Sequence, residues 1–396
     1  MTMAPPSNDI VIVGGGLAAV RAAQGLRTLG YDGPIRLYSN ESEPPYDRPP
    51  LSKDFLTGEL DTDGLQLLHD KALARLDLEI HLDSEVVALD PACRRLTLAD
   101  GTTVPYGRLV VATGAQARRL PGLSPSARIH YLRTVDDARA LRTALADASR
   151  ITVVGTGFIG LEVASSARHL GLEVDVVAAD EGPMIGLVGR RLSRWLAELH
   201  TAHGVRLTNS VVVSSVDESA TGVTLTLDDG TCRSSDIVAV GVGVSRELQW
   251  LREAGLEVDR GLVCDVDGRT SDPFVFGVGD IVCMHVGAEH EDLQHWTAAA
   301  DSARRTAHAL MEAERSHDPG DGFFWTEQHG HRLQFVGAGG TDAEVDVLSG
   351  SMDEGKFVAH LRCGSTVTGV FASNSPREFL EARLAFQKQV AAGAVG

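Results

Sequence analysis

The sequence predicts an α/β protein with two similar βαβ units and a third, C-terminal α+β domain. The first unit starts with the apolar strand Asp9–Val13, passes through a glycine-rich turn into a helix that runs to Leu29, and ends with the strand Ile35–Tyr38. Strands that alternate with helices are typical of parallel sheets. The length of 396 residues exceeds one typical core, which favours more than one domain.

A second βαβ unit repeats this plan later in the chain. The strand Ile151–Val154 leads through another glycine-rich turn and a helix to the strand Glu173–Val177. The last part of the chain differs, because strand-like runs at 356–361 and 366–372 precede a helix that starts near Arg377. We therefore expect an α+β domain at the C-terminus.

Both glycine-rich turns have the spacing of a dinucleotide-binding fingerprint. The first reads GGGLAA from Gly14, and the second reads GTGFIG from Gly155. The first glycine of a fingerprint allows a tight turn, the second lets the backbone approach a pyrophosphate, and the third small residue lets the helix pack on the strand. The helix N-terminus then faces the phosphates with its partial positive charge. The sequence thus predicts two Rossmann-like dinucleotide-binding domains. The turn residues expected to bind are Gly14, Gly16, Leu17 and Ala18 in the first domain, and Gly155, Gly157, Phe158, Ile159 and Gly160 in the second.

The composition restricts the partners and the compartment. The chain has 36 Lys and Arg against 54 Asp and Glu, a net charge of −18, which disfavours nucleic acids and anionic membranes as partners. No apolar run approaches the roughly 18 residues that cross a bilayer, and Met1–Asp9 does not read as a signal peptide, so we expect a cytoplasmic protein. The five cysteines form no C-x-x-C pair and the fourteen histidines match no metal-site spacing, so no bound metal is expected.

Several short motifs resemble those of one family of redox enzymes. The most discriminating is PPYDRPPLSK at 44–53, and others are YLRT at 131–134, GLE at 160–162, RTSDP at 269–273 and FWTEQ at 324–328. Over nearly its whole length the chain resembles the oxygenase-coupled ferredoxin reductases, the FAD-dependent pyridine nucleotide oxidoreductase family of putidaredoxin reductase and the biphenyl dioxygenase ferredoxin reductase. The resemblance implies hydride transfer from NADH to FAD, and then single electrons to a small [2Fe–2S] ferredoxin that serves a cytochrome P450 or a Rieske oxygenase.

The resemblance also implies a glutathione-reductase-like arrangement, in which one dinucleotide-binding domain is inserted into the other. LVVATGA at 109–115 and FVFGVGD at 274–280 would mark the exit from the FAD-binding domain and the return to it. The expected domains are an FAD-binding domain at 1–114 and 240–322, an NAD(H)-binding domain at 115–239, and a C-terminal α+β domain at 323–396. We expect a monomer or a homodimer.

Further site residues follow from the same resemblance. Asp280 would hold the ribityl hydroxyls, and either Asn40 or Glu41 would bind the adenosine ribose. The FAD contacts expected beyond the first glycine-rich turn are Asn40, Glu41, Arg48, Lys53, Val86, Thr113, Gly114, Arg133, Asp280, Trp296 and Trp325. Glu162, Asp180 and Gly243 are expected at the NAD(H) site in addition to the second turn.

Lys53 and Glu162 are the expected catalytic residues. In the family these positions pair, and burying either charge alone would be costly, so the two side chains are expected to meet. An ammonium beside the flavin would stabilise the electron-rich reduced ring.

The nicotinamide site departs from the family pattern. In NADH-specific members, the strand that corresponds to Glu173–Val177 usually ends with a Glu, and an Arg follows shortly after it. In this chain Ala178 occupies the position of that Glu. Asp180 or Glu181 is left to bind the ribose hydroxyls, and no arginine comes before Arg190 to bind a 2′-phosphate. We therefore expect NADH rather than NADPH.

Two other functions are alternatives to the reductase. NADH oxidases, peroxidases and disulfide reductases need a cysteine near the flavin, and the stretch Arg48–Phe55 has none. A redox sensor of the apoptosis-inducing-factor type, which binds FAD and NADH without ferredoxin turnover, stays open. For a reductase, docking an acidic ferredoxin on this acidic chain would need a local basic patch, for which Arg304, Arg305 and Arg332 are candidates.

Overall fold

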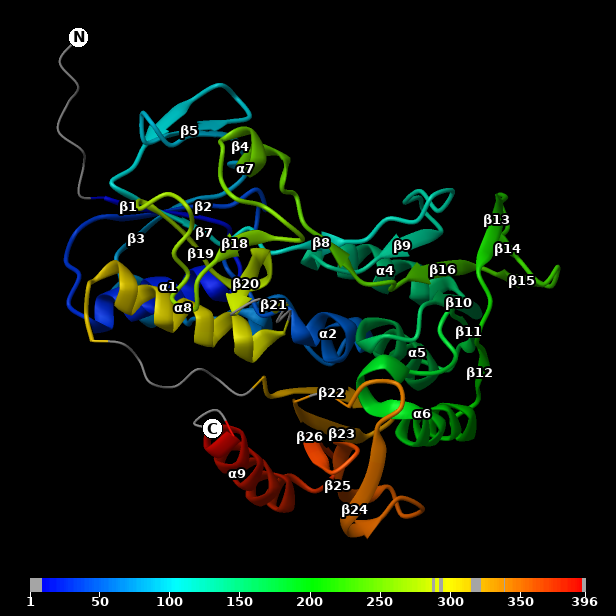
Figure 1. Cartoon of the computed structure of the whole chain (residues 1–396). Coiled ribbons are helices and arrows are strands. Elements are labelled where there is room, and N and C mark those ends of the chain that lie inside the picture. Colours follow the sequence, from blue (N-terminus) through cyan, green and yellow to red (C-terminus); the bar gives the residue numbers. More distant parts are fainter. Residues whose placement is uncertain (1–8, 287–288, 292–294, 315–321, 338, 394–396) are drawn as a thin grey trace. The chain divides into compact units, whose positions relative to one another are not determined.

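The computed structural model describes residues 9–286, 289–291, 295–314, 322–337 and 339–393, which form two compact units (Figure 1). The first unit comprises Met1–Asp47, Asp63–Gln116 and Ser245–Gly320, and the second comprises Arg48–Thr62, Ala117–Val244 and Asp321–Gly396. The short strands β8 (Gln116–Ala117) and β17 (Val244–Ser245) lie where the chain passes from one unit to the other. The segment Arg48–Thr62 thus groups with the second unit although the first unit flanks it in sequence.

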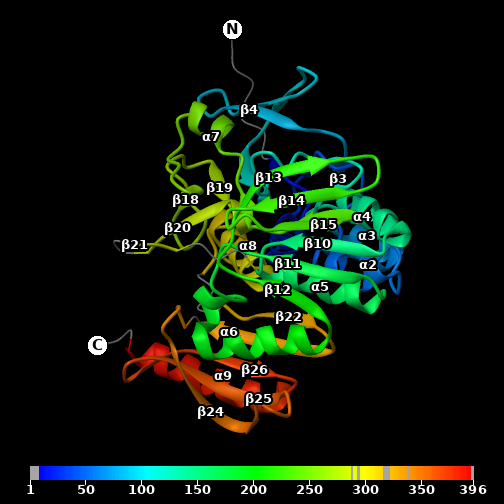
Figure 2. The same ribbon diagram turned by 90° about the vertical axis from the view of Figure 1, so that its right-hand side faces the viewer.

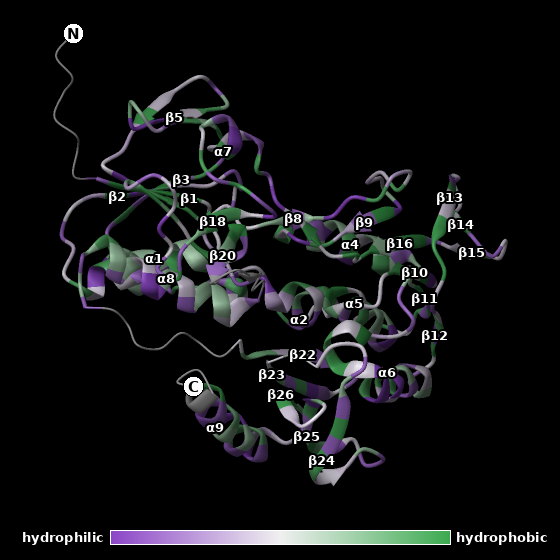
Figure 3. Ribbon diagram, in the orientation of Figure 1, coloured by the Kyte–Doolittle hydropathy of each residue, from purple (hydrophilic) through white to green (hydrophobic). Residues whose placement is uncertain are grey.

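A parallel five-stranded sheet forms the centre of the first unit, in the order β19-β7-β1-β2-β3. Its strands are β1 (Ile10–Val13), β2 (Ile35–Tyr38), β3 (Leu78–His81), β7 (Arg108–Val111) and β19 (Val275–Gly277). β1 is apolar along its whole length and lies in the green centre of this sheet in Figure 3. Such a strand is typical of a parallel sheet that is covered on both faces.

Different elements pack on the two faces of this sheet. Ile10 and Ile12 of β1 share a core with α1 (Leu17–Thr28) and α8 (Trp296–Leu310). Val11 and Val13 point the other way, into a core with the antiparallel sheet β4-β5-β6 and helix α7. The remaining elements of this unit are α3 (Asp70–Leu76), β4 (Val86–Asp90), β5 (Arg95–Leu98), β6 (Thr103–Pro105), α7 (Gln249–Glu253), β18 (Leu262–Cys264), β20 (Val282–Val286) and β21 (Glu289–Glu291).

The second unit contains another parallel five-stranded sheet, in the order β12-β11-β10-β16-β9. Its strands are β9 (Ile129–Tyr131), β10 (Arg150–Val154), β11 (Glu173–Val177), β12 (Val205–Thr208) and β16 (Ile237–Val240). Figure 2 shows β10, β11 and β12 side by side, and the antiparallel sheet β13-β14-β15 packs on Val154 and Val177 at one face. The other elements of this part are α2 (Asp54–Thr57), α4 (Val135–Asp147), α5 (Phe158–His169), α6 (Ile185–Ala202), β13 (Val213–Glu218), β14 (Val223–Leu227) and β15 (Cys232–Ser235).

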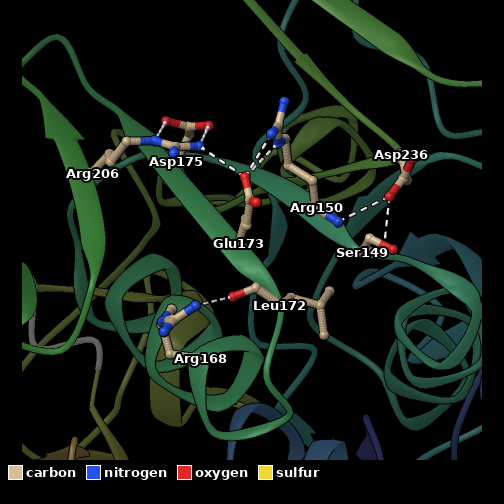
Figure 4. Close-up of polar contacts among 8 residues, drawn as sticks. All are labelled: Ser149, Arg150, Arg168, Leu172, Glu173, Asp175, Arg206 and Asp236. Atoms are coloured by element: carbon tan, nitrogen blue, oxygen red, sulfur yellow. Dashed lines mark hydrogen bonds and ion pairs between the residues drawn. The ribbon is translucent and has the colours of Figure 1, made fainter.

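Ion pairs link the strands at the amino-terminal edge of this second sheet (Figure 4). Arg206 on β12 binds both carboxylate oxygens of Asp175 on β11, at 2.7 and 2.8 Å. Arg150 on β10 binds Glu173 on β11 at 2.6 and 3.0 Å, and its backbone N–H donates to Asp236 at 2.9 Å. These contacts join neighbouring strands at the edge opposite the glycine-rich turn, so they leave that turn unobstructed.

The C-terminal part of the second unit is an antiparallel sheet in the order β22-β23-β26-β25-β24. Its elements are β22 (Phe324–Gln328), β23 (His331–Gly337), β24 (Glu344–Ser351), β25 (Lys356–Cys363), β26 (Thr366–Ser373) and α9 (Pro376–Gly393). Phe379 and Phe386 of α9 pack on one face. Leu192 and Leu196 of α6 pack on the other face, so this sheet shares a core with the second dinucleotide fold.

The predicted fold class is confirmed. Both βαβ units form parallel sheets, and the last residues form an antiparallel sheet with a helix. The predicted strands Ile35–Tyr38 and Glu173–Val177 have the bounds observed for β2 and β11. Among the described residues, no helix is both long and apolar enough to cross a membrane.

Candidate dinucleotide sites and a buried ion pair

The glycine-rich turn of the first unit has no room for a side chain at its first glycine. Gly14 has a φ of +120°, and a Cβ on it would lie 2.2 Å from the carbonyl oxygen of Ala112, which follows β7. α1 starts directly after Gly16, and no described side chain caps its first turn. Thr113 Oγ1 is buried beside this turn and has no hydrogen-bond partner among the described residues. The turn is therefore a cradle with unsatisfied donors, as a pyrophosphate site requires.

The neighbouring strands bring other expected FAD residues to the same carboxyl-terminal edge. Because β19 lies beside β7, the turn Gly279–Ile281 places Asp280 next to the Thr113–Gly114 turn. On the other side of β1, Asn40 and Glu41 follow β2, and Glu41 accepts a hydrogen bond from the hydroxyl of Tyr46. The first unit therefore gathers these predicted residues along one edge of its sheet.

Three more expected FAD residues of the first unit have defined surroundings. Trp296 Nε1 donates a hydrogen bond to Asp47 at 2.7 Å, and the guanidinium of Arg21 lies 5.8 Å from the centre of the Trp296 ring. Val86 begins β4 and packs, half-buried, against the core on the other face of the sheet. Ala18 is buried in the core under α1, whereas the small packing residue of the fingerprint is its neighbour Ala19, which is fully buried in the same core.

The second unit repeats the cradle. Gly155 has a φ of +111°, and a Cβ on it would lie 2.3 Å from the carbonyl oxygen of Gly241, which follows β16. No described side chain caps the first turn of α5 at Gly157, and Thr156 Oγ1 is buried without a partner among the described residues. Gly243, at φ +96°, follows the same strand end as Gly241. The second edge therefore offers the same unsatisfied donors as the first.

Phe158 and Ile159 differ in what their side chains do. The Phe158 ring packs edge-on against Phe324 and Phe335, with ring centres 5.0 and 6.0 Å away. It belongs to the apolar core, so a ligand would meet its backbone N–H rather than its ring. Ile159 is 40% exposed and stands next to the turn.

One of the acidic residues after β11 contacts an arginine that lies nine positions later in the sequence. Asp180 and Glu181 are exposed, and Glu181 forms an ion pair with Arg190. Arg190 Nε also lies 3.4 Å from Asp342. The sequence offered no arginine before Arg190 for this site, but the fold brings Arg190 itself, which follows a non-helical Gly189 within α6, back to Glu181. An arginine is thus present, but two carboxylates already bind it.

Lys53 and Glu162 form the expected ion pair within the second unit. Lys53 Nζ lies 3.0 Å from Glu162 Oε1, and the two side chains are 14% and 5% exposed. Glu162 also accepts hydrogen bonds from the hydroxyls of Ser52 and Thr326, the latter at 2.6 Å. Glu162 is therefore a buried carboxylate that faces one ammonium and two hydroxyl donors.

The other expected FAD residues of the second unit lie on separate elements. Arg48 donates a hydrogen bond to the carbonyl of Arg133 at 2.8 Å, and the Arg133 N–H donates to Asp137 at 3.0 Å. Trp325 on β22 stacks on Phe323 with ring centres 6.1 Å apart. The structure therefore joins Arg48 with Arg133, and Lys53 with Glu162.

Several polar residues at these sites were not found from the sequence. Asn209 follows β12, its Oδ1 is buried without a partner among the described residues, and the next N–H, of Ser210, donates to the carbonyl of Asp180. Thr156, Ser52 and Thr326 were likewise missed. A polar residue directly after a parallel strand is a usable signal for Asn209 and Thr156, whereas Ser52 and Thr326 join the site only through tertiary contacts. Within the described ranges, no group of three His, Cys, Asp or Glu side chains is placed to hold a metal ion.

Comparisons with known proteins agree with this geometry. Residues 8–303 match the family model described as pyridine nucleotide-disulphide oxidoreductase. The chain belongs to this family. Residues 323–395 match a second model, described as the reductase C-terminal domain. The family assignment makes the chain an oxidoreductase in which a reductase C-terminal domain follows the nucleotide-binding part.

Relatives of this oxidoreductase are reductase components of electron-transfer systems. Rhodocoxin reductase of Rhodococcus erythropolis is 36% identical over 386 residues, which cover 95% of this chain and 88% of that protein. The ferredoxin–NAD(+) reductase subunit of the benzene 1,2-dioxygenase system of Pseudomonas putida is 34% identical and covers 97% of this chain and 93% of its own. The covalent putidaredoxin reductase–putidaredoxin complex has a TM-score of 0.90 at 30% identity, over 96% of this chain and 93% of the matched chain.

Proposed function

We propose that this oxidoreductase is an FAD-dependent NADH:ferredoxin reductase. The observation that carries the proposal is the presence of two glycine cradles of the same construction, at Gly14 and Gly155, each at the carboxyl-terminal edge of a parallel sheet. One chain with two dinucleotide sites is suited to passing a hydride from one nucleotide to another. The reductase names of the relatives support a ferredoxin as the final acceptor.

FAD is proposed to bind the first unit. The tight turn at Gly14, the uncapped start of α1 and the unpartnered hydroxyl of Thr113 fit its pyrophosphate, and Asp280 fits its ribityl hydroxyls. When bound, FAD supplies a group that accepts a hydride and gives up electrons one at a time. The proposed part of Lys53, which follows from the family resemblance, is to present its ammonium to the flavin, while Glu162 holds that ammonium in place at 3.0 Å.

NADH is proposed over NADPH as the hydride donor. Asp180 and Glu181 are exposed after β11, where they would repel a 2′-phosphate and accept hydrogen bonds from ribose hydroxyls. Arg190 could otherwise bind a phosphate, but Glu181 and Asp342 engage it. The ion pairs therefore support the preference that the sequence predicted.

The proposed electron acceptor is a small [2Fe–2S] ferredoxin. The solved complex of putidaredoxin reductase with putidaredoxin supports this partner. Arg304 is 43% exposed, although it pairs with Asp301 at 3.2 Å, and Arg305 donates to the carbonyl of Val266 at 2.8 Å. Both remain proposed docking residues. The redox-sensor alternative gains no support from the relatives named above.

Anaerobic titration followed by turnover tests this function. Purified protein loaded with FAD should bleach near one equivalent of NADH per flavin, and should then reduce putidaredoxin in the steady state faster than the uncatalysed rate. Bleaching without transfer to any of a panel of [2Fe–2S] ferredoxins would favour the sensor. Failure to take up FAD in a folded protein would remove the whole proposal.

A further inference from the structure

A chain of buried side-chain hydrogen bonds leads away from the Lys53–Glu162 pair. Thr326 Oγ1 lies 2.6 Å from Glu162 Oε1, and Gln328 Nε2 lies 3.1 Å from Thr326 Oγ1. Both residues lie on β22 and point to the same side, since they are two positions apart. Thr326 and Gln328 are 0% and 1% exposed, so water does not replace these partners.

The chain continues into a cluster of histidines. Gln328 Oε1 lies 2.9 Å from His200 Nε2, and His200 Nδ1 lies 3.0 Å from His329 Nε2. His203, which is exposed, stacks on the His329 ring with centres 4.3 Å apart and planes within 12°. The contacts therefore run without a break from a buried carboxylate to a histidine next to an exposed imidazole.

The direction of every hydrogen bond in this series follows from the residue at its buried end, Glu162. A carboxylate that pairs with an ammonium accepts hydrogen bonds, so the hydroxyl of Thr326 donates to Glu162. That hydroxyl must then accept from the amide NH₂ of Gln328, which turns the Gln328 carbonyl toward His200. His200 therefore carries its proton on Nε2 and accepts on Nδ1, and His329 donates to it from Nε2.

The electrostatic surroundings agree with this direction, which needs a neutral His200. Burial lowers the pKa of His200 to about 4, with Gln328 opposing and the nearby His203 adding to the shift. Burial lowers the pKa of His329 to about 3, and the facing groups His200, His203, His331 and Arg168 lower it further. Both rings are therefore neutral near pH 7.

We propose that His200 and Gln328 are positioning residues for the Lys53–Glu162 pair. Each donor in this series of hydrogen bonds points toward Glu162. The series thereby orients the Glu162 carboxylate, and that carboxylate fixes the Lys53 ammonium. The link is electrostatic and geometric, because an amide side chain does not readily pass a proton along. The importance of this link for hydride transfer rests on the proposed function, whereas its direction rests on the contacts alone.

Nitrogen NMR of histidine-labelled protein tests the direction without any turnover. In the native protein His200 should be the Nε2–H tautomer, assigned by loss of its signals in His200→Gln. In Lys53→Met/Glu162→Leu the charges are gone, so Thr326 should donate to a turned Gln328 and His200 should become the Nδ1–H tautomer. Replacing a buried ion pair with apolar side chains of similar volume is often tolerated. An unchanged His200 tautomer in this variant would overturn the proposal.

One further variant, with an internal reference, keeps the test decisive if that double variant fails to fold. Thr326→Val removes the middle link of this series of hydrogen bonds and should give His200 as a mixture of both tautomers. A pure Nε2–H form of His200 in this variant would contradict the proposal. His130 is buried in the same unit and its Nε2 has no partner among the described residues, so its signals should not move in any of these variants.

Kinetics then test the consequence for the ion pair. His200→Leu removes the donor, and we expect the rate of flavin reduction by NADH to fall about tenfold, the effect of leaving one buried polar group unpaired. His200→Gln keeps an N–H near the Nε2 position and should restore most of that rate, and His130→Gln should match the native protein. Equal rates for the Leu and Gln variants would overturn the positioning role even if the ferredoxin proposal holds.

Discussion

Replacing Lys53 with Met should expose how strongly the buried ion pair is coupled. Glu162 is 5% exposed and would keep its two hydroxyl donors but lose the ammonium at 3.0 Å. Removing one partner of a buried ion pair costs about 3–5 kcal/mol, and the remaining donors place the expected loss near the lower end, at about 3 kcal/mol. Adding Glu162→Leu to Lys53→Met removes the stranded charge and should recover about 2 kcal/mol of that loss.

Urea unfolding of the native protein, Lys53→Met, Glu162→Leu and the double variant, at one saturating FAD concentration and pH 7.5, measures both the loss of stability and its recovery. The fixed ligand concentration matters, because bound FAD adds its own stabilisation. Lys388 is exposed on α9, so Lys388→Met is a matched control that should change stability by less than about 0.5 kcal/mol. A loss below about 1 kcal/mol for Lys53→Met, or strict additivity in the double variant, would refute the coupling.

Three other outcomes are expected. Gly14→Ala forces a Cβ to within 2.2 Å of the Ala112 carbonyl, so the purified variant should lose its yellow colour at matched protein concentration, while a native FAD content would contradict the cradle. Glu181→Ala leaves Arg190 with only the longer contact to Asp342, at 3.4 Å, and should raise kcat/KM for NADPH about tenfold, as one charge-assisted hydrogen bond to a 2′-phosphate allows, with Asp353→Ala as an exposed control. The folded-state pKa of His200, about 4, lies below its ordinary 6.5, so the unfolded chain binds more protons in that range and stability falls as pH drops from about 6.5 towards 4. Between pH 7.5 and 5 this term amounts to about 2 kcal/mol, and urea unfolding should show it missing in His200→Gln.

The parallel sheets were predictable because their signals are local. Each fingerprint places an apolar strand, a glycine turn and a helix within about thirty residues, which is the span of one βαβ unit. The antiparallel sheets β4-β5-β6 and β13-β14-β15 were missed, because their strands are short and only partly buried instead of forming apolar runs: β4 has one buried residue, and β14 alternates buried with half-buried residues.

The site residues divide in the same way. Gly14 and Gly155 could be predicted from local sequence because each follows a strand of a parallel sheet, where ligands bind, whereas Asp280 was expected from the family resemblance. The partners of Glu162 could not be identified from local sequence, since Ser52 and Thr326 are 110 and 164 positions away from it. Arg190 was not assigned to this site because it lies nine positions after Glu181, although the chain, bent at the non-helical Gly189, returns it to Glu181.

The grouping of Arg48–Thr62 with the second unit constrains how chimaeric reductases can be built. A graft that exchanged the nucleotide domain at residues 117 and 244 would carry Glu162 but leave Lys53 with the host protein. The donor carboxylate would then face a lysine from a different parent, with Ser52 also replaced. A graft that moves 48–62 and 321–396 together with 117–244 keeps the ion pair and its hydroxyl donors from one parent. The practical crossover points for recombination therefore lie at the unit boundaries and not at the ends of the fingerprint motifs.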